Sequence, residues 1–511
     1  MKIKLKILFL IWLSGHLAAQ SFLNPVIPGD FADPTIIRLN DTCYAVGTSS
    51  EWAPHYPVFK SADLINWNYA GPAFATKPAW TKGSFWAPEL YVLNGKVYLY
   101  YTARRASDGI SYIGVATTDQ IEKGFEDHGC IIEFGTEAID AFILEDEGKL
   151  YISWKAYGLD ARPIELLCAE LSADGLQRIG EPFMLLRDDE GIGMEGQIIY
   201  KEDGYYYILY SIRNCCGAES DYAVSAARSE SLRGPYEKYG RNPILQGDEN
   251  HVLSCGHGTA VKTPEGRLFY LYHAYLKGPG FFNGRQAFLK ELSMDEDRWP
   301  CFVTGNNAAI REPVPLKGIE QQPVADFEDN FSGNVIKPEW TWNFTYADLQ
   351  AEVKEGKLCL TGIAKAGNAY GTALCLRTQK PDYEILTQVE DRKDIFSGLT
   401  LYGDKDNLII FGKENGEVVL KEIRKGEEQV LYQNPALGDV HLKIEVRDGC
   451  IASCYWSLDQ KNWHSLPAAN QQHDVSYLPP WDRAFRPGLI HIGSENTPAE
   501  FMYCQLNYKY R

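Results

Sequence analysis

The chain has 511 residues, more than a single ordinary domain needs, and 45% of them are hydrophobic, which is enough for large cores. Its formal net charge of −18 excludes a polyanion such as nucleic acid as its partner, because phosphate binding needs a basic surface. A neutral oligosaccharide, polysaccharide or other neutral substrate is compatible with this charge.

The N-terminal segment at 1–19 has the pattern of a secretory signal peptide. Three lysines precede the apolar run at 7–13, and the small residues Ala18 and Ala19 follow it. No other apolar stretch approaches the roughly 20 residues that a membrane helix needs, and no cysteine stands at the cleavage site to carry a lipid. We therefore expect a periplasmic or secreted mature chain that begins near Gln20 and has no membrane span.

One sequence phrase recurs five times between Asp33 and Tyr275. It consists of an apolar run, a tight turn and a run rich in aromatic residues, which is typical of a β-hairpin. The turn residues of the copies follow one another at similar intervals and are Asp41, Gly95, Gly148, Gly204 and Gly266. A repeat of this length fits one four-stranded propeller blade. The pattern predicts a five-bladed β-propeller over residues 20–316.

The same alignment brings acidic residues to one position of the blade. Asp33 and Asp140 lie eight residues before their turn residues, Glu195 and His257 lie nine before theirs, and Ala87 has this place in the second blade. If the first strand of each hairpin is the innermost, these side chains meet at the mouth of the central channel. Three carboxyl groups crowded there should have perturbed pKa values.

The repeat ends near Leu316. Residues 317–330 form a connector rich in polar residues, Pro and Gly. From Phe331 onward, about ten short alternating strands are separated by turn residues, which is typical of an antiparallel β-sandwich of the concanavalin-like jelly-roll type. The whole chain is therefore predicted to be all-β, with residues 331–511 packing against the propeller and closing one side of its pocket.

The 12 cysteines show no repeated CxxC pair, so the sequence does not indicate a zinc site. Cys215 and Cys216 are adjacent and follow the aromatic strand after Glu195. They could remain free thiols, or they could form a disulfide that shapes the rim of the pocket.

Five segments resemble glycoside hydrolase family 43. They are FADPTII around Asp33, FWAPEL, AIDAFILEDEGKLYISW around Asp140, GMEGQIIYKEDGYYYILYS around Glu195, and CGHGTAV. The resemblance spans about residues 24–316, and the trailing sandwich is similar to the C-terminal domain of many xylosidase-like members. It implies a propeller enzyme such as a β-xylosidase, an α-L-arabinofuranosidase or an enzyme that trims arabinan or galactan.

By this resemblance Asp33 is the general base, Glu195 the general acid, and Asp140 the residue that orients the acid and tunes its pKa. Hydrolysis with inversion needs one protonated and one ionised carboxyl group at the same pH. We expect Asp140 to raise the pKa of Glu195 by like-charge repulsion, and Asp33 to stay ionised in a more solvated position.

Three further residues have two interpretations each. Trp86 could stack on a sugar in the glycone pocket or belong to the core. Arg285 could keep Asp33 ionised or bind a sugar hydroxyl, or it could lie in an exposed loop. His257 could be a hydrogen-bonded core histidine or help to hold a structural ion such as calcium near the propeller axis. No cofactor is required for the reaction.

We therefore predict an exported, exo-acting glycoside hydrolase that removes a terminal pentose, xylose or arabinofuranose, from plant cell-wall polysaccharide or oligosaccharides with inversion. The alternatives are a galactan- or arabinan-trimming hydrolase on the same fold and a non-catalytic carbohydrate-binding propeller. The retaining fructan hydrolases show NDPN-like, RDP and EC motifs, where this chain has ADPT, IDAF and MEG. A phosphorolytic enzyme would need a basic cluster, and only Arg285 lies near the motifs.

Overall fold

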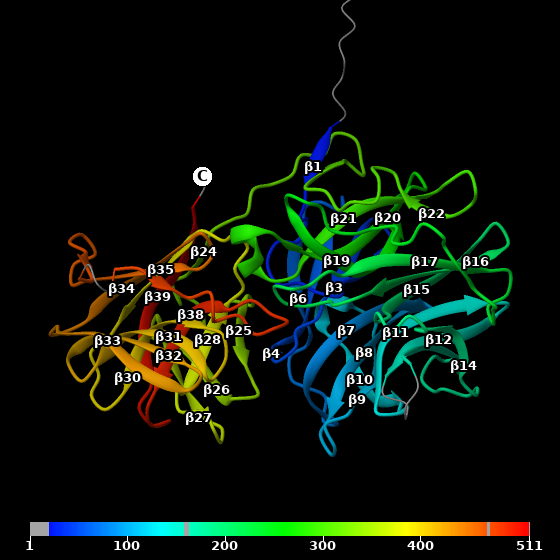
Figure 1. The fold of residues 1–511 in the computed structure, drawn as a ribbon. Coiled ribbons are helices and arrows are strands. Elements are labelled where there is room, and N and C mark those ends of the chain that lie inside the picture. Colours follow the sequence, from blue (N-terminus) through cyan, green and yellow to red (C-terminus); the bar gives the residue numbers. More distant parts are fainter. Residues whose placement is uncertain (1–19, 158–162, 468–470, 510–511) are drawn as a thin grey trace, which may run out of the picture.

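The computed structural model describes residues 20–157, 163–467 and 471–509. The predicted signal peptide at 1–19 lies outside these residues. The described chain forms two β-rich bodies that lie side by side (Figure 1). The helical elements within these ranges are the 3-10 helices η1 (Ile121–Lys123) and η2 (Gly278–Asn283). No helix in the described part of the chain is long and apolar enough to cross a membrane.

The first body is a five-bladed propeller, as the repeat predicted. Each blade is a four-stranded antiparallel sheet. In chain order the blades are β2 (Thr35–Leu39), β3 (Thr42–Val46), β5 (His55–Ser61) and β6 (Asn68–Phe74); β7 (Thr81–Leu93), β8 (Lys96–Arg105), β9 (Ser111–Thr118) and β10 (Glu126–Ile132); β11 (Glu137–Asp146), β12 (Lys149–Tyr157), β13 (Glu165–Glu170) and β14 (Phe183–Arg187); β15 (Glu195–Glu202), β16 (Tyr205–Ile212), β17 (Ala223–Ser229) and β18 (Glu237–Lys238); β19 (Val252–Lys262), β20 (Leu268–Leu276), β21 (Gln286–Met294) and β22 (Pro300–Phe302).

The first strand of each blade is the innermost one. Strands β2, β7, β11, β15 and β19 contact one another in a closed ring, and five apolar clusters fill the spaces between successive blades. The N-terminal strand β1 (Ser21–Leu23) pairs with β23 (Arg311–Pro313), which follows the last blade. This pairing ties the start of the propeller to its end.

A left-handed residue marks the same place in every blade; in the last four blades it lies at a β-bulge of the inner strand, and in the first blade it lies just before β2. The residues with positive φ are Asp33 (50°), Ala87 (40°), Asp140 (59°), Gly196 (58°) and His257 (40°). The equivalent residue in the fourth blade is therefore Gly196, and Glu195 stands one place before it. The prediction that Glu195 shares the position of Asp33 and Asp140 is wrong by one residue.

The second body is a β-sandwich of two antiparallel sheets around the largest apolar cluster in the described chain. One sheet runs in the order β33 (Glu427–Pro435), β32 (Glu417–Arg424), β31 (Asn407–Glu414), β30 (Phe396–Tyr402), β38 (Arg486–Ile492), β28 (Thr372–Leu376), β25 (Trp340–Asn343) and β4 (Trp52–Ala53). The other runs in the order β26 (Ala347–Lys354), β27 (Lys357–Ala364), β39 (Ala499–Tyr508), β29 (Tyr383–Val389), β34 (Val440–Arg447), β35 (Ile451–Ser457) and β36 (His464–Ser465), with β24 (Phe327–Asp329) on β39 and β37 (His473–Asp474) on β35.

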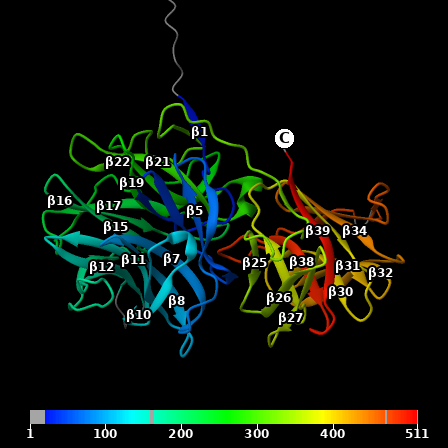
Figure 2. The ribbon, with the colours of Figure 1, turned by 180° about the vertical axis from the view of Figure 1, so that it is seen from behind.

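Strand β4 belongs in sequence to the first blade but completes a sheet of the sandwich. Trp52 pairs with Asn343 and Ala53 with Trp342, so backbone hydrogen bonds join the two bodies. Seen from behind, the C-terminal strand β39 runs along the sandwich, and β25 lies on the side that faces the propeller (Figure 2). The two bodies therefore share an interface close to the first and second blades.

Candidate active site

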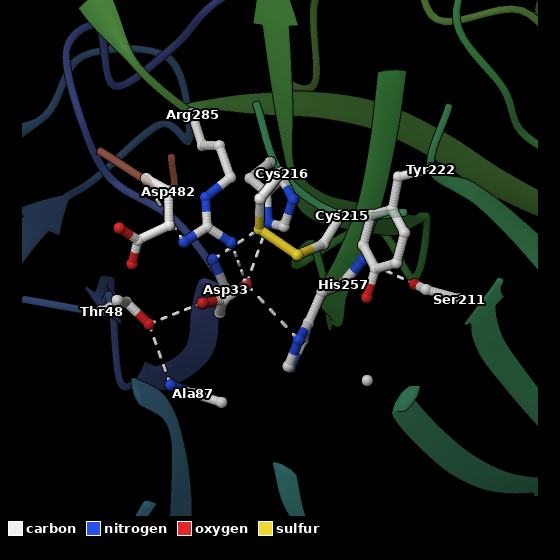
Figure 3. Close-up of polar contacts among 12 residues, drawn as sticks. Asp33, Thr48, Ala87, Ser211, Cys215, Cys216, Tyr222, His257, Arg285 and Asp482 are labelled. Carbon is white, nitrogen blue, oxygen red and sulfur yellow. Dashed lines mark hydrogen bonds and ion pairs between the residues drawn. A yellow bond between two sulfur atoms is a disulfide. The ribbon is translucent and has the colours of Figure 1, made fainter. Parts of the chain in front are cut away.

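Asp33 is a buried carboxylate held from several sides. Its Oδ1 lies 3.1 Å from Arg285 Nη1 and 3.5 Å from His257 Nδ1, and its Oδ2 accepts a hydrogen bond of 2.7 Å from the Thr48 hydroxyl (Figure 3). Burial raises the pKa of Asp33, but Arg285, with help from His257, outweighs it and holds this pKa well below its ordinary value. Asp33 is ionised as predicted, but the cause is Arg285 and not exposure to solvent.

Asp140 contacts the backbone beside Glu195. Its Oδ2 accepts a hydrogen bond of 3.0 Å from the Gly196 N–H, and its carbonyl oxygen accepts one of 2.6 Å from the Gln197 amide. Burial raises the pKa of Asp140 to about 6; His257 opposes this shift, and the negative charge of Glu195 adds to it. Asp140 therefore fixes the segment that carries Glu195 and has a pKa near the mildly acidic range.

Both oxygens of Glu195 receive hydrogen bonds. Lys155 Nζ lies 2.6 Å from Oε2, and the Tyr222 hydroxyl donates to Oε1 over 2.8 Å. Burial raises the pKa of Glu195, but Lys155 and Tyr222 outweigh it, so this pKa lies below its ordinary value. The prediction that Asp140 raises the pKa of Glu195 is therefore wrong for this structure: the repulsion between the two raises the pKa of Asp140, because Lys155 stabilises the ionised Glu195.

His257 lies between the carboxylates. Its Nδ1 is 3.5 Å from Asp33 Oδ1 and 3.9 Å from Asp140 Oδ2, and its backbone N–H donates to the Ser211 hydroxyl. A Cβ atom at Gly196 would lie 2.7 Å from the His257 ring, so the glycine makes room for this histidine. Within the described ranges, no group of three or more His, Cys, Asp or Glu side chains is arranged to hold a metal ion.

Trp86 and Arg285 both lie at the site. Trp86 directly precedes the bulge residue Ala87, as Glu195 precedes Gly196, so the two residues have equivalent places in the second and fourth blades. The Trp86 ring is partly exposed, and the Arg104 guanidinium lies 5.4 Å from its centroid. Arg285 is only 4% exposed, which excludes the interpretation as an exposed loop residue.

The sandwich contributes a loop to this site. Asp482, on the segment before β38, lies beside Arg285 (Figure 3) and its carbonyl oxygen accepts a hydrogen bond of 3.4 Å from Arg285. Its Oδ2 accepts a hydrogen bond from the Ser50 hydroxyl. The next residue, Arg483, forms an ion pair with Glu51 of the first blade. Side chains from opposite ends of the sequence therefore meet beside Asp33.

Cys215 and Cys216 form a disulfide on the loop that leads from β16 to Tyr222. The neighbouring Gly217 N–H donates to the Tyr275 hydroxyl, and a Cβ atom at Gly217 would lie 3.3 Å from the carbonyl oxygen of Trp481. Figure 3 draws the disulfide beside Arg285 and Tyr222. The loop that carries it therefore meets the sandwich loop at the rim of the site, and the disulfide alternative is the correct one.

A cavity of about 540 Å³ lies between the first blade and the sandwich, away from the three acids. Its lining includes Trp67, Tyr69 and Arg377, together with Thr48, whose hydroxyl bonds to Asp33. Two of its polar side chains hold the connector in place: Asn66 bonds to the backbone of Glu320 and Gln322, and Gln321 makes two hydrogen bonds to the backbone of Leu23.

A family model described as glycosyl hydrolases family 43 matches residues 22–300. The chain belongs to this family. A second model, the beta xylosidase C-terminal concanavalin A-like domain, matches residues 328–480. As a member of family 43, this protein is a glycosidase that acts on a carbohydrate substrate.

Named relatives include xylosidases, arabinofuranosidases and an endo-arabinanase. The chain is 26% identical to a xylan 1,3-beta-xylosidase of a Vibrio species over 88% of this chain and 91% of the relative. It is 29% identical to the extracellular exo-alpha-(1->5)-L-arabinofuranosidase ArbA of Cellvibrio japonicus, over 53% of this chain and 86% of the relative. A solved xylan beta-1,4-xylosidase of Bacillus halodurans shares the fold, with a TM-score of 0.83, 22% identity and coverage of 95% and 100% of the two chains.

Sequence reasoning found Asp33, Asp140, Glu195, Trp86, Arg285 and His257, all of which lie in or beside this ring. It missed Lys155, Tyr222, Thr48, His273 and Asp482. Lys155 and His273 could have been found by aligning the second strand of each hairpin as well as the first, and Thr48 by extending that alignment two residues beyond β3. The sequence carries no comparable signal for Asp482, because it comes from the other body.

Proposed function

We propose that this family 43 glycosidase is an exported, exo-acting enzyme that removes a terminal pentose with inversion of configuration. The observation that carries the proposal is the ring of three carboxyl groups, each with different partners. Asp33 is paired with Arg285, and Glu195 with Lys155 and Tyr222. Asp140 binds the backbone N–H next to Glu195. An inverting reaction needs one carboxyl group that is ionised as the base and another that is protonated as the acid.

In the proposed reaction, Asp33 accepts a proton from a water molecule as the water oxygen bonds to the anomeric carbon. The bond from that carbon to the leaving oxygen breaks, and Glu195 gives its proton to this oxygen. Asp140 has a positioning role, because it binds the Gly196 N–H next to the acid. One proton enters at Asp33 and one leaves from Glu195, so each turnover ends with both groups needing to exchange a proton with solvent.

Exo-action is supported by the way the site is bounded. The Cys215–Cys216 loop and the segment around Asp482 meet on one side of the ring, and this contact favours a pocket for a chain end over an open cleft. The pentose is supported by those relatives that are named as xylosidases and arabinofuranosidases. Export is supported by the signal-peptide pattern of residues 1–19.

The test is hydrolysis of a panel of aryl xylosides, arabinofuranosides and galactosides and of arabino-oligosaccharides, with the product anomer followed by proton NMR. Inverted pentose as the first product is the expected result. A retained anomer would overturn the inverting mechanism, internal cleavage of arabinan would overturn exo-action, and binding without turnover would indicate a carbohydrate-binding propeller. Recovery of the mature chain from the cytoplasm alone would overturn export.

Asp33→Asn and Glu195→Gln separate the two roles. Loss of the base should abolish turnover of every substrate. Loss of the acid should remove about 10²–10⁴-fold of activity on poor leaving groups and much less on activated aryl glycosides, which need little protonation. An equal loss on both kinds of substrate in Glu195→Gln would contradict the acid role.

A further inference from the structure

The second strands of the blades carry a ring of their own around the site. In each of the last four blades one second-strand residue lies opposite the residue that precedes the bulge; these residues are Thr102, Lys155, Ser211 and His273. In the first blade Thr48, two residues beyond the end of β3, has this place opposite Ala32. Four of the five accept a hydrogen bond from the backbone of the left-handed residue in the next blade. These bonds are Ala87 N–H to Thr48 Oγ1 (2.9 Å), Asp140 N–H to Thr102 Oγ1 (3.2 Å), His257 N–H to Ser211 Oγ (2.8 Å) and Asp33 N–H to His273 Nδ1 (3.1 Å).

Lys155 breaks this pattern. A lysine ammonium group has three donors and no acceptor, so it cannot accept the N–H of Gly196, the bulge residue of the next blade. That N–H donates to Asp140 Oδ2 instead, over 3.0 Å. Lys155 therefore does not make the backbone hydrogen bond that its four equivalents make. Its Nζ lies 2.6 Å from Glu195 Oε2 instead.

A serine or threonine at this place could accept the backbone N–H of the next blade, as Thr48, Thr102 and Ser211 do. A buried lysine, in contrast, carries a desolvation penalty. The Lys155 side chain is only 11% exposed. Resting on the proposed function, we infer that Lys155 is a positioning residue of the acid: it holds Oε2 of Glu195 and thereby places the transferable proton on Oε1.

The donors and acceptors around the Glu195 carboxyl group determine which oxygen can carry the proton. Oε2 faces an ammonium group that can only donate, so a proton on Oε2 would have no acceptor there. Oε1 faces the Tyr222 hydroxyl, which can donate to a carboxylate or accept from a carboxylic acid. The acidic proton therefore belongs on Oε1, and from Oε1 it passes to the leaving oxygen as the glycosidic bond breaks. Lys155 then stabilises the carboxylate that remains.

The charged and titratable groups that face Glu195 come from four elements: Lys155 on β12, Asp140 on β11, His257 on β19 and Tyr222 directly before β17. Glu137 adds a more distant negative charge beside Lys155. Lys155 contributes most to lowering the pKa of Glu195. Because the acid must be protonated to act, kcat/KM falls as the pH rises through this pKa, and removing the Lys155 charge should move the alkaline limb of the pH profile upward.

The experiment compares Lys155→Met, Lys155→Arg and the control Lys149→Met. Lys149 lies on the same strand and pairs with Glu170 at the surface, over 2.9 Å. In Lys155→Met the alkaline limb of the kcat/KM profile should move to a pH about one unit higher. Its kcat on an unactivated disaccharide should fall about tenfold more than on a dinitrophenyl glycoside, because misplacing the proton matters most where the leaving group needs it.

Lys155→Arg, which also only donates, should restore both properties, and Lys149→Met should behave like the wild type. An unmoved alkaline limb in Lys155→Met, or an equal loss on both substrates that arginine does not rescue, would overturn the inference.

If the wild type turns over no glycoside, the proposed function fails, and the role of Lys155 is then tested without substrate. The Glu195 carboxyl is titrated by carbon-13 NMR and assigned with Glu195→Gln; a pKa that does not rise in Lys155→Met would overturn the placement.

Discussion

At the scale of single residues, Arg285 is the main group that stabilises the ionised form of Asp33. We expect Arg285→Gln to raise the pKa of Asp33, because its largest favourable partner is lost while burial continues to oppose the ionised form. The base must be ionised, so the acidic limb of kcat/KM should move upward by about 1–3 pH units. Steady-state rates between pH 3 and 8 measure this shift. Arg285→Lys, which keeps the charge, should shift the limb less.

The same pair contributes to stability. The pKa of Asp33 is depressed in the folded chain, so its contribution is fully present above the unfolded-state pKa of about 3.9 and is lost as the pH falls through the folded value. Removing Arg285 leaves a buried unpaired charge, which costs about 3–5 kcal/mol. Urea unfolding should therefore show a large deficit for Arg285→Gln at pH 6 that narrows below about pH 4. A deficit independent of pH would contradict this account.

At the scale of secondary-structure elements, the bulge of β15 requires a glycine at position 196 because a side chain there would collide with His257, and not because of the positive φ. Asp33, Ala87, Asp140 and His257 adopt the same left-handed φ with side chains, whereas a Cβ at Gly196 would meet the His257 ring at 2.7 Å. Gly196→Ala should therefore displace His257 and lower kcat. The control Gly204→Ala, in a turn with open space around it, has the backbone strain alone, about 1 kcal/mol. Equal activity in the two variants would show that the contact is relieved without cost.

The loop that carries the Cys215–Cys216 disulfide is expected to affect the shape of the site more than the stability of the fold. Chain-entropy stabilisation by a disulfide grows with the length of the loop that it closes, and Cys215 and Cys216 are adjacent. Replacing both with serine should change the Tm by less than about 2 °C, while KM for the substrate rises because the rim that meets the Trp481 segment loses its fixed shape. Cys301→Ser, at a free half-buried cysteine on β22, is the control. A large fall in Tm with unchanged KM would assign the disulfide a structural role instead.

At the scale of the whole molecule, the sequence predicts the architecture better than the chemistry. The repeat predicts five blades because each hairpin must repeat its turn and its apolar faces to bury the interblade clusters. Counting from the turns misplaces Glu195 by one residue because Gly196 provides the bulge. The same counting follows first strands only, and so it misses Lys155. Asp482 lies beyond any local pattern, because a loop of the other body brings it to Asp33.

The interface between the two bodies is therefore part of the active site, and its ion pairs should affect both stability and turnover. Arg483 pairs with Glu51 and lies 3.0 Å from Asp482 Oδ1. Burial lowers its pKa to about 10, so it remains charged at neutral pH. Arg483→Met leaves two carboxylates without their partner where Asp482 contacts Arg285. We expect a loss of about 3 kcal/mol in unfolding free energy.

The Arg483→Met variant should also raise KM, because the loop that bounds the pocket is released from the first blade. Arg241→Met is the matched control: its pair with Asp297 spans 3.4 Å with both side chains 72% exposed, and such surface pairs contribute about 0–1 kcal/mol. Differential scanning calorimetry and KM on one aryl pentoside measure the two effects. If Arg483→Met lowers the Tm without changing KM, the interface joins the two bodies but does not shape the pocket. A change in KM that Arg241→Met reproduces would trace the effect to net charge instead of to the loop.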